Sequence, residues 1–164
     1  IRLKRPLLGK APLFSAATIL FHTLLIVLPF VTPGHNILLD DYFGINLPTL
    51  SESTVDNLTL VFILLGGFFF VRRIVVARVR SVTTYRDWLA WLVTVAPFIT
   101  GYLAFHQTFD YDTLLLLHII CGELMLIAIP FTKLVHMPFF FFARFLIRNE
   151  LTFGSGTRKW VETT

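Results

Sequence analysis

The sequence predicts an all-α integral membrane protein, a four-helix bundle with both termini on the cytoplasmic side of a bilayer. The mean hydropathy is +0.75. Of the 164 residues, 55% are hydrophobic and only 15% are charged, which is atypical of soluble domains. Four apolar stretches approach the roughly 20 residues that a spanning helix needs. The basic residues also gather in three regions of the chain instead of being scattered along every stretch.

The four apolar stretches define the expected helices. Proline should kink or end the first of them, at Pro29 and Pro33, and should bend the third and fourth, at Pro97 and Pro130. We expect the helices at about residues 12–32, 55–76, 88–105 and 113–146.

The remaining segments are expected to lie outside the apolar layer. Residues 35–48 mix acidic residues with Gly and Pro, which favours an interfacial loop containing a short amphipathic turn. Residues 149–164 form a polar tail, so residues 1–148 make up the predicted membrane domain.

The positions of Lys and Arg indicate the topology. All 14 lie at the N-terminus, at residues 72–86 around the connection between the second and third stretches, or from Lys133 onward. The other two loops contain Asp and Glu but no basic residue. With four crossings the three basic regions share one side, and the positive-inside rule makes that side cytoplasmic. We therefore expect a multi-pass protein of the cytoplasmic (inner) membrane of a prokaryote, surrounded by lipid. The net charge of +4 forms no face for nucleic acid.

Four histidines accompany the first and last stretches. His22 and His35 are thirteen residues apart, and His118 and His136 are eighteen apart. Eighteen residues make five helical turns, so these two imidazoles would leave one face about 27 Å apart, against about 20 Å for thirteen residues. Because the first helix runs outward and the fourth inward, depth pairs His35 with His118 and His22 with His136. Polar groups inside a bilayer are costly and usually functional. The pattern predicts two metal centres stacked across the membrane.

Haem b fits this pattern best. Bis-imidazole iron carries electrons without needing an open coordination position. Zinc and di-iron sites need ligands close together, often with carboxylates, whereas these pairs lie at opposite faces. Gly122, on the same face as His118, would let a flat macrocycle approach. A lone histidine in a span is often only a hydrogen-bonded interior residue, but two pairs matched in depth favour ligation.

The histidine segments resemble a known family. The segment ending at His136, LLHIICGELMLIAIPFTKLVHM, is similar to the fifth helix of the gamma subunit of respiratory nitrate reductase, with its PF-[ST]-[KR]-L-x-H signature. The stretches FHTLLIVLPFVTPGH and RRIVVARVRSVTTYRDWL resemble the matching histidine helix and the basic connecting loop. The spacing of His22 and His35 is wider than in that subunit. This spacing, and the run HMPFFFF, are more similar to the DsrM, TmcC and heterodisulfide-reductase-associated branch.

The resemblance implies a set of ligands and partners. His22 and His136 would hold the iron of an inner haem b, and His35 and His118 that of an outer haem b. It also implies a quinone site, with menaquinone as the expected quinone, and an iron–sulfur partner subunit on the cytoplasmic face. Nitrate itself is not the expected substrate. Five-helix members of the family have a further helix before the first histidine helix.

The expected function is that of a membrane b-type cytochrome subunit in an anaerobic respiratory complex. It would carry electrons between the quinone pool and the iron–sulfur partner. The chain has no iron–sulfur cysteines and no nucleotide motif, so we expect half a redox reaction rather than a complete enzyme. The alternatives are a b cytochrome that exchanges electrons with an outer-face multihaem cytochrome, and a non-redox membrane anchor for a catalytic subunit.

Five other polar residues are candidates for quinone or haem contacts. Glu123, in the fourth span, could accept a proton from a quinol, with a structural hydrogen bond as the alternative. His106 could bond a quinone carbonyl or a haem propionate, or simply sit at the interface. Arg72, Arg73 and Lys133 could pair with the propionates of the inner haem, although they also fit as ordinary topology anchors.

Overall fold

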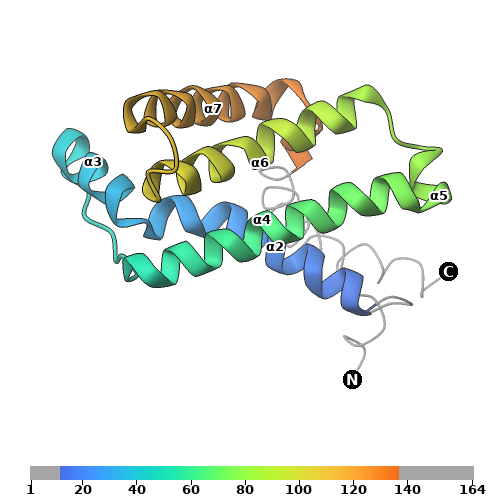
Figure 1. The fold of residues 1–164 in the computed structure, drawn as a ribbon, viewed down its shortest axis with the longest axis horizontal. Coiled ribbons are helices and arrows are strands. Elements are labelled where there is room, and N and C mark those ends of the chain that lie inside the picture. The colour runs from blue at the N-terminus through green and yellow to red at the C-terminus, as the bar shows by residue number, and fades with distance from the viewer. Residues whose placement is uncertain (1–11, 137–164) are drawn as a thin grey trace, which may run out of the picture.

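A computed structural model describes residues 12–136, and these residues form helices and no strand. Four helices are long and apolar enough to cross a membrane, and they run alternately in opposite directions (Figure 1). This confirms the all-helical class and a multi-pass membrane protein. The elements in order are α2 (Pro12–Val31), α3 (Pro33–Phe43), α4 (Glu52–Val75), α5 (Ala77–Arg80), α6 (Tyr85–Phe105), α7 (Tyr111–Phe131) and the 3-10 turn η1 (Lys133–Val135).

Three spans begin two or three residues earlier than hydropathy predicts, because polar caps precede the apolar run. The Ser51 side chain accepts a backbone N–H at the start of α4. Thr84 and Asp87 form a reciprocal capping box at the start of α6. Asp110 caps α7 in the same way as Ser51 caps α4. Each cap satisfies N–H groups that would otherwise lack a partner in the first helical turn.

The segment expected as an interfacial loop is largely helical. The chain is extended at Thr32, and α3 then begins at Pro33, where the missing N–H of proline costs nothing. Gly44 ends α3 in the left-handed conformation, with φ of 64°, which glycine adopts without a Cβ penalty. His35 is therefore held on a short helix set off from α2.

The predicted fourth helix is wrong in its extent. The helix α7 ends at Phe131, because Thr132 is extended and its side chain accepts the Leu134 N–H that opens η1. Pro130 weakens this last turn, since it donates no backbone hydrogen bond. His118 and His136 therefore do not share one continuous helix. The rest of the predicted helix, to residue 146, and the tail at 149–164 lie outside the described residues.

The core lies where α2, α4 and α6 meet. Phe62 of α4 is fully buried. Its ring stacks on Phe21 of α2 at 4.5 Å between centroids, and it lies 4.0 Å from Phe98 of α6. Gly66 lets α6 approach, since a Cβ there would lie 3.2 Å from a Val95 methyl group. Gly66 thus serves ordinary helix packing.

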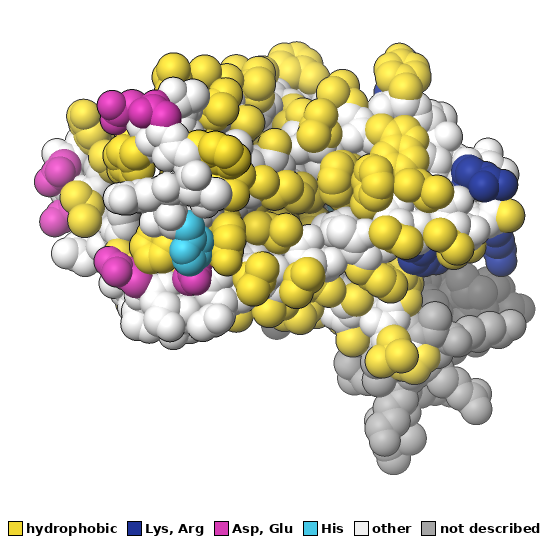
Figure 2. Space-filling view, in the orientation of Figure 1, with side chains coloured by type: hydrophobic (Ala, Val, Ile, Leu, Met, Phe, Trp, Pro, Cys, Tyr) yellow, Lys and Arg dark blue, Asp and Glu magenta, His cyan; other side chains and the backbone are white. Residues whose placement is uncertain are grey.

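The surface divides into three zones along the bundle. Figure 2 shows Asp and Glu side chains at the end where α3 lies, Lys and Arg at the end where α5 lies, and hydrophobic side chains between them. The helix α7 packs chiefly on α6 and leaves most of its apolar side chains exposed. An apolar belt between two charged ends suits a bilayer.

Candidate metal centres

The outer histidine pair is brought together by α3 and α7. The rings of His35 and His118 lie 9° from parallel, with centroids 5.7 Å apart. Their Nε2 atoms are 3.4 Å apart. The helix break at Thr32 moves His35 off the axis of α2, and this accommodates the unequal spacings of the two histidine helices.

Backbone carbonyls orient both outer rings. Nδ1–H of His35 donates to the Pro29 carbonyl at 2.9 Å, an acceptor without its usual helical partner because Pro33 has no N–H. Nδ1–H of His118 donates to the Pro97 carbonyl at 2.8 Å. A carbonyl only accepts, so the proton of each neutral ring is on Nδ1 and its Nε2 presents a lone pair. Two lone pairs at 3.4 Å repel each other unless a cation lies between them.

Gly101 makes room for the His118 ring. A Cβ built at Gly101 would lie 2.8 Å from Cε1 and 3.0 Å from Nδ1 of His118, closer than carbon atoms pack. The Thr100 hydroxyl lies 3.5 Å from the same Nδ1. The sequence reasoning did not single out Gly101, although a glycine inside a spanning helix is a signal of close approach.

The inner pair joins α2 to the residue after η1. The rings of His22 and His136 are edge to face, with centroids 5.9 Å apart and planes at 74°. Nδ1–H of His22 donates to the Thr18 carbonyl at 2.7 Å, and Nδ1–H of His136 donates to the Lys133 carbonyl. All four histidines of the two pairs therefore share one tautomer, with Nε2 left free.

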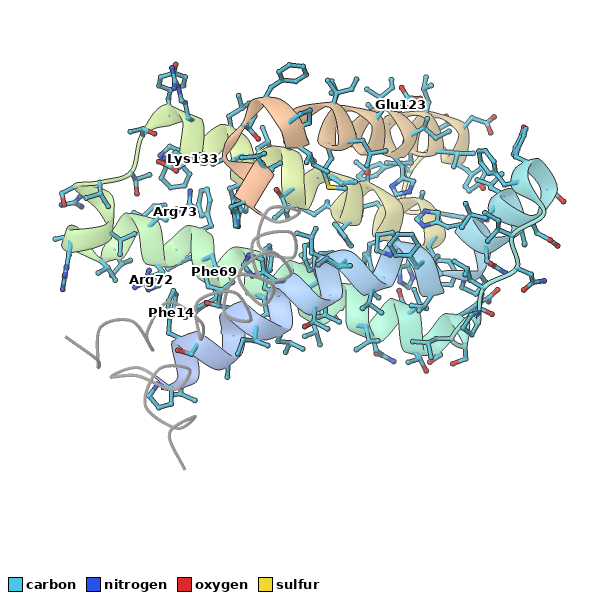
Figure 3. All side chains as sticks on the ribbon, turned by 180° about the vertical axis from the view of Figure 1, so that it is seen from behind. Phe14, Phe69, Arg72, Arg73, Glu123 and Lys133 are labelled. Atoms are coloured by element: carbon cyan, nitrogen blue, oxygen red, sulfur yellow. The ribbon has the colours of Figure 1, made fainter. Side chains whose placement is uncertain are left out.

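A cavity of about 440 Å³ adjoins the inner pair, and its lining includes both histidines together with Arg72, Arg73 and Lys133. The basic residues predicted to surround the inner site are thus brought together (Figure 3).

Each cation of the inner cavity already has a partner. The Arg72 guanidinium lies 4.1 Å from the centroid of the Phe14 ring. Arg73 donates to the Asp87 carbonyl at 2.7 Å, and Lys133 donates to the Asp87 carboxylate at 2.8 Å. The sequence reasoning did not single out Asp87, although Thr84-x-x-Asp87 is a readable capping-box signature.

Each centre offers two histidine nitrogens and little else. No cluster of three or more His, Cys, Asp or Glu side chains that could hold a metal ion occurs within residues 12–136. A structural zinc site takes four protein ligands and a catalytic one takes three. The donor set fits a metal whose other positions are filled by a macrocycle.

The other predicted residues lie outside these contacts. His106, at the end of α6, pairs with Asp56 of α4 at 2.9 Å. Glu123 is exposed on α7 (Figure 3), and no hydrogen bond or ion pair holds it among the described residues. A Cβ at Gly122 would meet open space, so there is room beside the helix at this position.

Comparison with known proteins finds one informative match. A protein of Nitratidesulfovibrio vulgaris (strain Hildenborough), named only "Protein", is 45% identical over 135 residues, which is 82% of this chain and 60% of the relative. The chain thus spans less than two thirds of the length of that relative. No protein-family model and no solved structure matches the chain.

Proposed function

We propose that the chain is a membrane b-type cytochrome, the electron-transfer subunit of a quinone-linked respiratory complex. His35 with His118, and His22 with His136, would each hold one haem b. The observation that carries the proposal is the shared tautomer of the four rings. Each Nδ1–H is bonded to a backbone carbonyl, so each Nε2 is free to bind a metal. A second-shell hydrogen bond of this kind sets the orientation and basicity of a ligating imidazole.

The spacing of the outer pair supports the binding of one metal ion between His35 and His118. Imidazole nitrogens lie about 2.0–2.1 Å from a bound metal, so two nitrogens on opposite sides of it stand about 4 Å apart. The Nε2 atoms of His35 and His118 are 3.4 Å apart. A separation larger by roughly 0.6–0.8 Å would accommodate a metal, which is a small adjustment for two side chains.

The inner cavity supports the second centre. Its volume of about 440 Å³ lies within the ~300–1,000 Å³ typical of ligand pockets. Arg72 and Arg73 would stabilise the carboxylates of a haem there through charge-assisted hydrogen bonds, while Lys133 stays bonded to Asp87 at 2.8 Å. A bound haem would supply one-electron chemistry, with its potential set by the axial ligands.

The topology supports a direction across the membrane. The Lys and Arg end would face the cytoplasm, and by the same rule both termini would lie on that side, His22 and His136 would form the inner pair, and an iron–sulfur partner would bind against that end. The resemblance to the nitrate reductase gamma-subunit-like family, and to its DsrM, TmcC and heterodisulfide-reductase-associated branch, supports the same arrangement in the cytoplasmic membrane of a prokaryote.

Two residues are proposed for the proton side of quinone chemistry. A quinol loses two electrons and two protons when it is oxidised. Glu123 is exposed on a spanning helix, where a quinol dissolved in the bilayer can reach it. Its carboxylate would accept one of the protons, and the other would pass to water at the membrane surface. His106 could serve the same site only by leaving Asp56, with which it pairs at 2.9 Å.

Reduction by a quinol tests this function. The purified chain in liposomes is mixed with a reduced menaquinone analogue, and the absorbance of reduced b haem is followed in the wild type, Glu123→Gln and His118→Ala. We expect reduction in the wild type, slower reduction in Glu123→Gln, and loss of one haem in His118→Ala. A membrane anchor would instead show no reducible haem and would tolerate His118→Ala.

A further inference from the structure

Asp87 connects three elements at the inner end of the bundle. Its carboxylate accepts the backbone N–H and the hydroxyl of Thr84, each at 2.8 Å. The other carboxylate oxygen accepts Lys133 Nζ at 2.8 Å, and the backbone carbonyl accepts Arg73 at 2.7 Å. A single residue therefore ties the end of α4 and the start of α6 to η1.

The tether continues from Lys133 to His136. The side chain of Lys133 is bonded to Asp87, while its backbone carbonyl accepts Nδ1–H of His136. The ring of His136 lies beyond the end of α7, after the extended Thr132 and the turn η1, so α7 itself does not fix its direction. The backbone of His136 is helical and its N–H is bonded within η1, and the bond from Nδ1–H to the Lys133 carbonyl orients the ring.

We infer that Asp87 is a positioning residue for His136, acting through Lys133 to hold the imidazole with Nε2 toward the inner cavity. The inference rests on the proposed function, because it treats His136 as a haem ligand. It differs from the sequence expectation, in which Lys133 pairs with a propionate.

Two simpler roles need to be separated from positioning. Lys133 is 60% exposed and the Asp87 side chain is 16% exposed, so the pair could be an ordinary surface ion pair of little consequence. Asp87 could also act only as the cap of α6. Lys133→Met removes the tether and leaves the capping box intact, so it distinguishes positioning from capping.

The variants to compare are Asp87→Ala, Lys133→Met and Lys133→Arg. The matched control is Asp110→Ala, because Asp110 caps α7 with bonds to the N–H and hydroxyl of Thr113 but contacts no residue of the inner cavity. Haem content and the midpoint potential of each haem are measured in the purified full chain.

Both tether variants should weaken inner haem binding by about 10- to 100-fold, the usual effect of losing a residue that orients a ligand. The potential of any inner haem that remains should shift, while the outer haem keeps its potential. Lys133→Arg should restore both properties, and Asp110→Ala should behave as the wild type. Two haems with an unchanged inner potential in both Asp87→Ala and Lys133→Met would overturn the inference.

A second readout does not depend on haem. The ¹⁵N shifts of the His136 imidazole report its tautomer, assigned by comparison with His136→Gln. The wild type should show the Nδ1–H form, and both tether variants should show a mixture of tautomers. If the wild type carries no haem, the proposed function fails, and these shifts decide the positioning role separately. Unchanged shifts in both variants would refute it.

Discussion

Gly101→Ala tests how closely α6 supports the outer histidine pair. The added Cβ would lie 2.8 Å from Cε1 of His118, whereas carbon atoms pack best at about 3.5–4.0 Å. The ring must withdraw by roughly 0.7 Å or more. It cannot do so freely, since Nδ1–H is bonded to the Pro97 carbonyl at 2.8 Å.

The expected effect is on the site more than on the fold. Overpacking of this kind costs about 1–3 kcal/mol, which corresponds to roughly 5- to 150-fold weaker binding at the outer site. Alanine is favoured over glycine by about 1 kcal/mol in a helix interior, so the higher helix propensity offsets part of the overpacking cost to the free energy of unfolding. The protein should therefore fold and insert while losing outer haem.

The assay is a pyridine haemochrome count per chain together with a redox titration. Gly67→Ala is the matched control, because a Cβ at Gly67 of α4 meets nothing within 4 Å. We expect two haems in the wild type and in Gly67→Ala, and close to one in Gly101→Ala, with the inner haem unchanged. Two haems of unaltered potential in Gly101→Ala would refute the reasoning.

Three further changes test other contacts. Gly122→Ala meets no protein atom within 4 Å, so the unfolding free energy should not fall, and a drop in outer haem content would indicate that the macrocycle fills that space. His106→Ala breaks a pair with side chains 40% and 24% exposed, so unfolding in detergent should change by only about 0–1 kcal/mol; a larger loss would show that the pair is more than a surface contact. The pKa of Asp110 lies below its usual 3.8 because the hydroxyl and backbone N–H of Thr113 donate to it. The cap therefore stabilises the folded protein fully above the usual pKa of 3.8. This stabilisation is lost as the pH falls through the lower pKa that Asp110 has in the folded protein. The protection factors of the amides at the start of α7 should therefore fall in strong acid, and Asp110→Ala should show the lower protection already at neutral pH.

Much of the arrangement could be predicted from the sequence, because hydropathy and basic clusters are long-range signals. Span lengths predicted four crossings in this order, as the four long apolar helices show, and the Lys and Arg clusters predicted their direction. The predicted direction of each helix and the depth of each histidine paired His35 with His118 and His22 with His136. The structure brings the two rings of each pair together.

The residues at which the helices end depend on local side-chain hydrogen bonds to the backbone, which hydropathy does not detect. At Thr132 the hydroxyl donates to the Ala128 carbonyl at 2.7 Å and accepts the Leu134 N–H. These bonds favour the end of α7 at Phe131, although the apolar run continues in the sequence. The helix α3 was readable, since Pro33 and Gly44 bracket it with typical start and stop residues.

The contacts around the sites could not be predicted, because they depend on how the helices rotate against one another. Gly101 meets a ring on α7 that is seventeen residues away. The bond from Lys133 to Asp87 joins residues 46 positions apart. Neither the spacing nor the residue type alone indicates such a partner.

The central claim is that each histidine pair holds one haem b. The direct measurement is a dithionite-reduced minus oxidised visible spectrum of the purified protein, with a pyridine haemochrome count, on the wild type and on His118→Ala. We predict two b haems per chain in the wild type and one in His118→Ala. A wild type with no b-type signal would contradict the claim, and so would a variant that keeps both haems.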